Sequence, residues 1–235
     1  IGLCLVGSEM CIRDRIIPVF EGCNKAPNNA TINLSRGASI AVKSAFKSDS
    51  FNGETGESLS IWTKNCQVIL LGLGGKDELT LKKSRDAGAK CLASLSKNHG
   101  TEIVVRFTSG WNLENMVSFT EGMILRDYVF DKYQKKDEDE KGPWSLEGQT
   151  VERHKKAFKL EVKNVFSVAS GVHLARDLGN EPANKLFPEE FGRRALEWAK
   201  GKTNVEVEVW DYNRLKEEGM YLSLIHISEP TRQSP

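Results

Sequence analysis

The stretch 67-QVILLGLGG-75 decides the fold of this 235-residue chain, because it is a continuous apolar run that ends in glycines. A strand buried on both faces of a parallel sheet has this pattern, and the glycines indicate a sharp turn directly after it. The segment 101-TEIVVRF-107 shows the same apolar pattern about one helix length further on. Both segments predict central strands of a sheet covered by helices on both sides.

Helical stripes of apolar residues alternate with these strands. The stripes predict helices over 34–45, 77–100 and 112–128, and shorter β-rich runs predict further strands over 16–20, 59–62 and 157–162. We therefore predict an α/β fold in which a mixed, mainly parallel sheet is sandwiched by helices over residues 16–162.

The chain changes character after this domain. A helical stripe over 164–178 predicts a connecting helix, which we bound at 163–181. Pro188 then suits the first position of another helix, and 205-VEVEV-209 alternates with a period of two. We predict that 182–221 is the start of a second α/β domain, with 205–209 as a strand of its own sheet.

Both ends of the chain differ from the middle. Residues 222–233 can be encoded by a DNA string whose reverse complement, read in a shifted frame, encodes Cys4 to Arg15. The string resembles a transposon-derived sequencing adapter. We therefore interpret 1–15 and 222–235 as translated adapter sequence that packs against nothing, and place the natural protein, itself truncated, over about 205 residues between them.

Composition excludes several classes of protein. The net charge of +1, from 33 basic and 32 acidic residues, gives no electrostatic signature for nucleic acid or an anionic membrane. No apolar run approaches the length of a transmembrane helix. Only Cys23, Cys66 and Cys91 remain outside the interpreted adapter ends, and such a sparse, odd set is typical of a reducing cytosol.

Glycines at 72–75 could free backbone N–H groups to hold a phosphate. The alternative is a plain turn from strand to helix. The spacing favours the turn, because 72-GLGGKDEL-79 matches neither the dinucleotide-binding fingerprint nor a Walker loop.

No other motif predicts an active site. Consecutive acidic residues at Asp137–Glu140 are flanked by lysines and indicate a solvated loop. His99, His154 and His173 are scattered and form no zinc-binding helix motif. A serine nucleophile elbow and a local cysteine signature are also missing. The residues themselves predict no catalytic, cofactor-binding or metal-ligating position in this chain.

A resemblance begins at residue 175. The segment 175-ARDLGNEPANKLFPEEF-191 resembles the start of the catalytic domain in leucyl aminopeptidases, the cytosol aminopeptidase family. The segment 205-VEVEVWDYNRLKEEGM-220 resembles the strand and helix that follow there. Upstream, 68-VILLGLGGKDELT-80 and 122-GMILRDYVFDKY-133 resemble the family's N-terminal domain, so the likeness covers nearly all of 16–220.

The resemblance implies a metal-dependent aminopeptidase as the parent protein. Such enzymes remove N-terminal residues from peptides with two divalent metals, manganese or zinc, and the parent would be a cytoplasmic hexamer that needs neither nucleic acid nor a membrane. The family's metal ligands belong to a signature absent from this chain, so we expect no cofactor here and no activity. The alternatives are a macro-domain-like module that binds ADP-ribose or another nucleotide, and a DNA-binding protein, which the neutral charge does not support.

Overall fold

The computed structural model consists of two units, 1–177 and 178–235, and each is described by itself. The residues that the structure describes are 13–23, 25–27, 34–48, 50–62, 67–95, 102–108, 110–134, 145–150 and 152–220. None of the described helices is long and apolar enough to cross a membrane.

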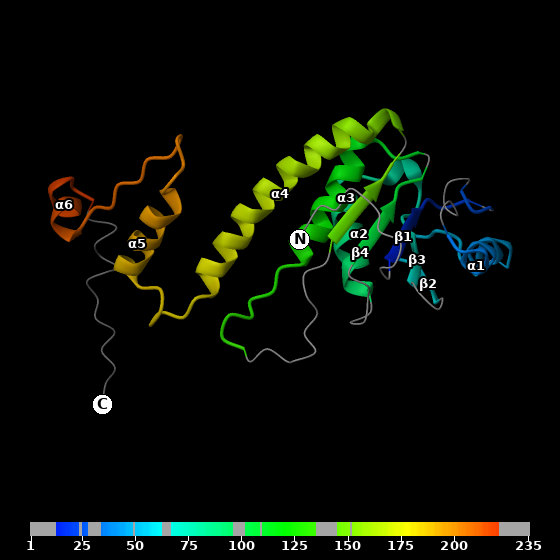
Figure 1. Cartoon of the computed structure of the whole chain (residues 1–235), viewed down its shortest axis with the longest axis horizontal. Helices are drawn as coiled ribbons and strands as arrows, with labels where there is room; N and C mark the ends of the chain where they lie inside the picture. Colours follow the sequence, from blue (N-terminus) through cyan, green and yellow to red (C-terminus); the bar gives the residue numbers. More distant parts are fainter. Residues whose placement is uncertain are drawn as a thin grey trace. The chain divides into compact units, whose positions relative to one another are not determined.

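A five-stranded sheet forms the centre of the first unit (Figure 1). The strands lie in the order β2-β3-β1-β4-β5, and only β2 runs antiparallel to its neighbour. Their bounds are Arg13–Val19 (β1), Ser58–Trp62 (β2), Gln67–Gly72 (β3), Glu102–Arg106 (β4) and Ser145–Gln149 (β5). The predicted α/β fold with a mixed, mainly parallel sheet is confirmed.

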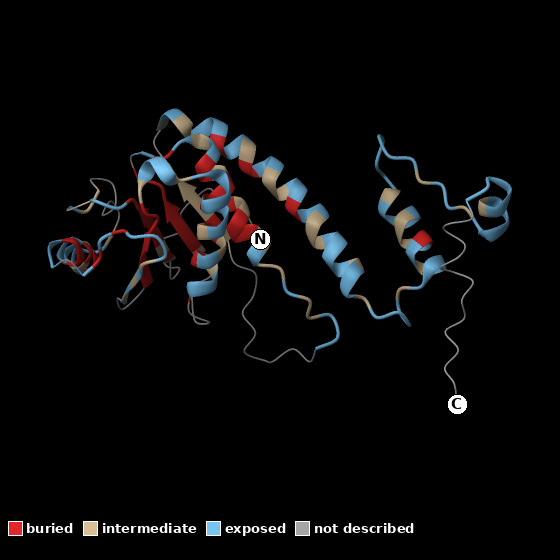
Figure 2. Cartoon of the chain, turned by 180° about the vertical axis from the view of Figure 1, so that it is seen from behind, coloured by how far each residue is buried: buried red, intermediate tan, exposed pale blue. Residues whose placement is uncertain are grey.

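Helices cover both faces of the sheet, and the most buried residues lie between the layers (Figure 2). Helix α1 (Arg36–Lys47) packs on one face, and helices α2 (Leu81–Ser94), α3 (Leu113–Arg126) and α4 (Glu152–Asn180) pack on the other. Side chains alternate across a strand, so Ile16 and Ile69 face the α2–α4 side while Ile17 and Leu70 face α1. All six residues of β3 are buried, as its apolar run predicts.

Two glycines let α2 and α3 pack closely. A Cβ atom added to Gly122 would lie 1.9 Å from the carbonyl oxygen of Arg85, and one added to Gly88 would lie 2.0 Å from that of Phe119. Cys91 is fully buried in the same layer, and this burial raises the pKa of its thiol.

The predicted strand over 157–162 is wrong, because α4 is helical from Glu152 to Asn180. A strand would turn residues 158, 160 and 162 to one side. Phe158 and Val162 are buried, four residues apart on one helical face, whereas Leu160 is 60% exposed. The fifth strand is β5, in which Leu146 is the buried residue.

The predicted helix over 77–100 begins later than expected. A single 3₁₀ turn, η1 (Lys76–Glu78), follows β3, and α2 begins after its N-cap Thr80, whose hydroxyl accepts a hydrogen bond from the Lys83 N–H. The Thr80 cap satisfies one of the first helical amides, which explains the later start. The last predicted turn, 96–100, lies outside the described residues.

The N-terminal boundary also differs from the prediction. Strand β1 begins at Arg13, and Asp14 is 2% exposed, with its Oδ1 accepting a hydrogen bond from the Gln67 N–H at 2.8 Å. The expectation that residues 1–15 pack against nothing is therefore wrong for this segment. Pairing of β1 with Glu102 and Ile103 in β4 uses backbone groups, which are independent of the side chains. Residues 1–12 and 221–235 lie outside the described part.

The second unit contains α5 (Pro188–Ala199) and α6 (Tyr212–Glu217). The predicted helix start at Pro188 is confirmed, with Pro188 in the first turn of α5, and Asp211 is the N-cap of α6. The predicted strand over 205–209 is not formed. A strand requires a partner for its backbone groups, and no described segment of this unit pairs with it.

Candidate functional site at the end of helix α4

The two segments that carry the family resemblance meet at the end of the first unit. Arg176 of α4 donates a hydrogen bond from Nη1 to the carbonyl oxygen of Leu125 in the last turn of α3, at 2.8 Å. The last carbonyls of a helix have no partner within it, and a cation there also suits the helix dipole. Arg176 therefore binds α4 to the C-terminal end of α3.

Tyr128 provides the second contact between these segments. Its hydroxyl donates to Oδ1 of Asp177 at 2.9 Å, and its ring lies 5.4 Å from the Arg176 guanidinium carbon. The ring of His173 lies 5.3 Å from the ring of Tyr128. We call Leu125, Tyr128, His173, Arg176 and Asp177 the α4 clasp.

The contacts of the α4 clasp attach α4 to the C-terminal end of α3 and the residues after it. The Nε2 atom of His173 is buried and has no hydrogen-bond partner. Asp177 lies one helical turn after His173, but its carboxylate accepts from Tyr128. No nucleophile paired with a base occurs here, which is the arrangement that covalent catalysis requires.

Manganese or zinc requires several converging carboxylate, imidazole or thiolate ligands. Among the described residues no group of three or more His, Cys, Asp or Glu side chains could hold a metal ion. The residues described here do not fit the two-metal site implied by the resemblance, and no catalytic step is assigned to them.

The backbone amides of the glycine loop after β3 already donate hydrogen bonds within the chain. The Gly72 N–H donates to Glu57, the Leu73 N–H to Val19 and the Gly74 N–H to Gly53, all to backbone carbonyl oxygens within 3.0 Å. A phosphate cradle needs such amides free to donate. The structure thus supports the plain turn over the phosphate loop.

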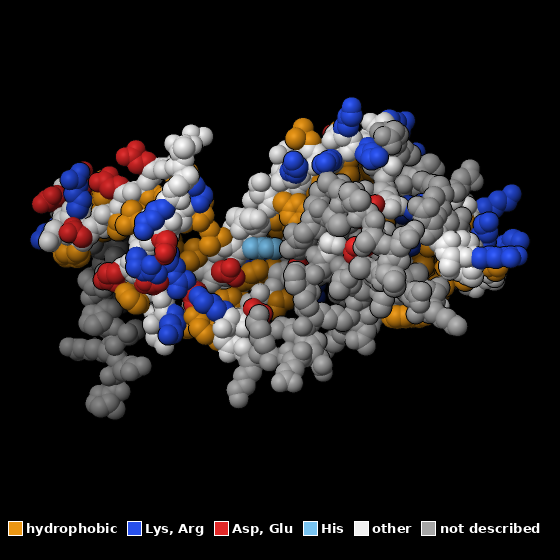
Figure 3. Space-filling view, viewed as in Figure 1, with side chains coloured by type: hydrophobic (Ala, Val, Ile, Leu, Met, Phe, Trp, Pro, Cys, Tyr) orange, Lys and Arg blue, Asp and Glu red, His pale blue; other side chains and the backbone are white. Residues whose placement is uncertain are grey.

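The segment after α4 is held by an ion-pair network within the second unit. Arg194 donates from Nη1 to Glu181 at 2.9 Å and from Nε to Glu190 at 2.8 Å, and the Glu181 side chain is only 1% exposed. Arg193 also donates to Glu190. The hydrogen bonds from Arg193 and Arg194 lower the Glu190 pKa from 4.5 to about 2. The network ties the 181–187 loop to α5, where basic and acidic side chains gather next to one another (Figure 3).

The other described histidines and cysteines that were candidate site residues lie apart from one another. His154 accepts a hydrogen bond from the neighbouring Arg153, Cys23 is a half-buried free thiol and Cys91 is buried. His99, Cys66 and the acidic run Asp137–Glu140 lie outside the described residues. Of the candidates that lie within the described residues, only His173 belongs to a cluster, the α4 clasp.

Sequence reasoning missed the clasp and the ion-pair network. Glu190 and Arg194 are four residues apart on a predicted helix, a spacing that signals an ion pair. No local signal identifies Tyr128 with Asp177, or Glu181 with Arg194, because these partners are distant in sequence.

Comparisons with known families match both parts of the chain. The family model described as "Cytosol aminopeptidase family, N-terminal domain" matches residues 16–137. The model described as "Cytosol aminopeptidase family, catalytic domain" matches residues 173–235. The α4 clasp thus joins a segment of the first match to a segment of the second.

Two relatives are named probable cytosol aminopeptidases. The protein of Clostridium perfringens is 33% identical over 218 residues, covering 86% of this chain and 41% of the relative. The protein of Rhizobium etli is 35% identical over 158 residues, covering 66% of this chain and 31% of the relative. The chain spans well under half the length of these relatives.

Solved structures share the fold. A mutant of tomato leucine aminopeptidase matches with a TM-score of 0.72 and 19% identity, covering 100% of this chain and 48% of that one. The bottromycin maturation enzyme BotP in complex with Mn matches with a TM-score of 0.63 and 20% identity, covering 90% and 41%. Since the N-terminal family match alone covers more than half of its residues, the chain belongs to the cytosol aminopeptidase family.

Proposed function

We propose that this chain carries the N-terminal domain, the connecting helix and the first part of the catalytic domain of a leucyl-type aminopeptidase. The observation that carries the proposal is the order of the two family matches, residues 16–137 and then 173–235, with α4 running between them. The parent enzyme would remove N-terminal residues from peptides.

The parent would use two divalent metals, manganese or zinc. The solved complex of BotP with Mn, a protein of the same fold, supports this metal class. The described residues of this chain offer no cluster of metal ligands. We therefore propose that the chain alone is inactive and that the residues holding the metals belong to a part of the catalytic domain that it does not contain.

The purified chain can be tested directly with leucine amide as substrate, in the presence of added Mn²⁺ or Zn²⁺. We expect no release of leucine above a buffer control containing the same metal. Release that a chelator abolishes would contradict the proposed inactivity of the chain, while leaving its family membership unaffected.

The family relationship also motivates a proposal about the cellular context of the parent. We propose a cytoplasmic enzyme, since its relatives are named cytosol aminopeptidases, that acts on peptides as a homo-oligomer, a hexamer. The net charge of +1 supports neither nucleic acid nor an anionic membrane as a partner.

A nucleotide-binding module is not favoured. Such a module would use the glycine loop for phosphate, yet the Gly72, Leu73 and Gly74 amides donate to carbonyls of the chain. Nothing in that function would employ the second unit either.

The codon relationship between the ends remains a separate proposal. We propose that residues 1–15 and 222–235 derive from adapter DNA, because the codon match covers Cys4 to Arg15. Resequencing the gene from genomic DNA without adapters tests this. A gene that encodes 222-LSLIHISEPTRQSP-235 in place would overturn it.

A further inference from the structure

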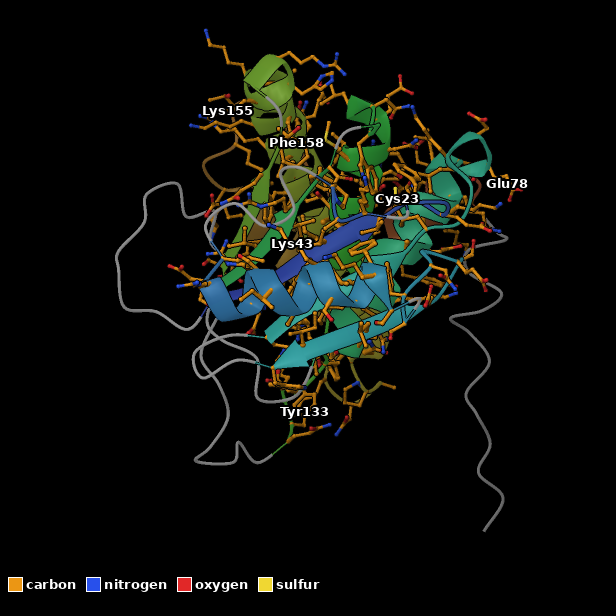
Figure 4. The ribbon with its side chains drawn as sticks, turned by 90° about the vertical axis from the view of Figure 1, so that its right-hand side faces the viewer. Cys23, Lys43, Glu78, Tyr133, Lys155 and Phe158 are labelled. Carbon is orange, nitrogen blue, oxygen red and sulfur yellow. The ribbon has the colours of Figure 1, made fainter. Side chains whose placement is uncertain are left out.

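Among the described strands, β2 is an edge strand of the sheet. It lies at the end of the strand order and pairs only with β3 among the described strands. In an antiparallel pair, alternate residues turn their backbone N–H and C=O groups away from the partner. The outer edge of β2 therefore presents a row of donors and acceptors suited to another strand. Figure 4 shows β2 beside α1 at this side of the sheet.

The sequence of β2 lacks the usual protection of an edge strand. Natural edges carry lysine, proline or other charged residues that block pairing, whereas Ser58–Trp62 reads SLSIW and contains none of these. Trp62 is 62% exposed at the end of the strand, and Ile40 of the covering helix α1 is 60% exposed. Within the part of the chain that the structure describes, this edge combines exposed apolar surface with backbone groups that pair with no further strand.

The side chains on the α1 face determine what kind of strand fits. Leu59 and Ile61 are half buried and pack against the α1 cluster around Val42 and Phe46. A strand added beside β2 would place alternate side chains over them on the same face. Apolar residues at those alternate positions would extend the cluster, and small polar residues suit the other face beside Ser58 and Ser60.

We propose that the β2 edge binds the β2 edge of a second copy of this chain, antiparallel and centred on Ser60. In this register Leu59 of each copy faces Ile61 of the other, Ser58 faces Trp62, and Ser60 faces Ser60. A two-fold axis perpendicular to the sheet keeps both α1 helices on one face, so the two apolar clusters join. With no charge in either strand, no like-charge pair opposes the contact.

The sequence of β2 itself favours a second copy of β2 as the added strand. The strand supplies the apolar alternation on one face and serines on the other that its partner requires. The pairing closes at two copies, because each copy contributes its single β2 edge. A short strand pair makes a weak contact, so the dimer forms reversibly with rising concentration.

A disulfide tests the register. Directly opposed residues in an antiparallel pair have Cα atoms about 4.5–5.5 Å apart, within the range of about 4.4–6.8 Å that a disulfide spans. Ser60→Cys should therefore form a covalent dimer under mild oxidation with diamide. Ser58→Cys is the matched control, because the two copies of residue 58 would lie about 13 Å apart in this register. Both variants retain the native cysteines.

The proposal expects Ser60→Cys to yield covalent dimer at least about tenfold faster than Ser58→Cys, in the full-length chain. Equal rates, or no dimer from either variant, would overturn the register. Circular dichroism verifies that each variant is folded as the unsubstituted chain is.

Sedimentation equilibrium tests the contact without cysteine chemistry. The weight-average mass of the unsubstituted chain should rise with concentration from 26.2 kDa towards twice that value. Trp62→Lys adds a charge to the edge and should keep the chain monomeric, whereas Leu160→Lys on exposed α4 should associate normally. A chain monomeric at every concentration, or equal association of the two lysine variants, would contradict the proposal.

Discussion

The hydroxyl of Tyr128 donates a hydrogen bond to Asp177 across 49 residues of sequence, with 2.9 Å between Oη and Oδ1. Asp177 is the last residue of the first unit, and Tyr128 lies two residues after α3. Together with the Arg176 bond to Leu125, this contact fixes the C-terminal half of α4 to the domain that precedes it. Within the Ala-Arg-Asp-Leu motif, Arg176 and Asp177 thus attach α4 to the preceding domain.

Tyr128→Phe should loosen this part of α4. The change removes one partly exposed hydrogen bond, which contributes about 0.5–1.5 kcal/mol, and keeps the ring. Amide hydrogen exchange near Asp177 should accelerate about 2- to 10-fold. Tyr212→Phe, which removes an exposed hydroxyl in the second unit, is the control and should leave α4 unchanged. Unaltered exchange in Tyr128→Phe would show that the clasp does not hold the helix.

Two glycine substitutions should have opposite effects on stability. Gly122→Ala places a Cβ atom 1.9 Å from the Arg85 carbonyl oxygen, so α2 and α3 must separate, at a cost of about 1–3 kcal/mol. Gly171→Ala in α4 meets nothing within 4 Å and should stabilise the chain by about 0.5–1 kcal/mol. Urea unfolding measures both. A neutral Gly122→Ala would contradict the close packing of these helices.

Arg194→Ala should release the 181–187 loop from α5. Arg194 bridges Glu181, whose side chain is 1% exposed, and Glu190. Arg193→Ala is the matched control, since Arg193 is 59% exposed and contacts only α5 residues among its ion-pair partners. Amide exchange in residues 181–187 should rise clearly in Arg194→Ala and little in Arg193→Ala. Equal effects would mean that the buried pair does not order the loop.

The same network predicts a pH dependence for the second unit. The Glu190 pKa in the folded chain is about 2, below its ordinary value of 4.5, because Arg193 and Arg194 donate to the carboxylate. The folded state therefore binds fewer protons than the unfolded state in this interval. The stabilisation is complete above pH 4.5 and is lost as the pH falls towards about 2. Amide exchange in α5 should accelerate over that interval, and Glu190→Gln should remove this contribution.

The sheet could be predicted where burial alone determines the pattern. Val68–Gly72 of β3 and Ile103–Val105 of β4 form buried apolar runs, a pattern that indicates a covered strand. Strand β5 could not be found this way, because Ser145–Gln149 buries Leu146 and little else. At 157–162 the apolar residues Phe158 and Val162 fit a helix as well as a strand, and packing of α4 decided between them.

The candidate site was less predictable than the fold. Arg176 and Asp177 appear in the sequence as part of a family motif, but their partners Leu125 and Tyr128 are set by how α3 and α4 pack. At 205–209 the period of two predicted a strand that does not form, and only Val207 is half-buried while Val205 and Val209 are exposed. A strand forms only when a neighbouring strand takes its backbone groups, which a local pattern does not reveal.

The most direct test of the central claim compares this chain with the longer parent enzyme that we propose. Both are assayed for hydrolysis of leucine anilide, with metal present, after chelation and after Mn²⁺ or Zn²⁺ is restored. We predict that the longer protein releases aniline, loses that activity with the chelator and regains it with metal, while this chain releases none. Activity of the longer protein that is indifferent to the chelator, or metal-dependent activity of this chain alone, would contradict the account.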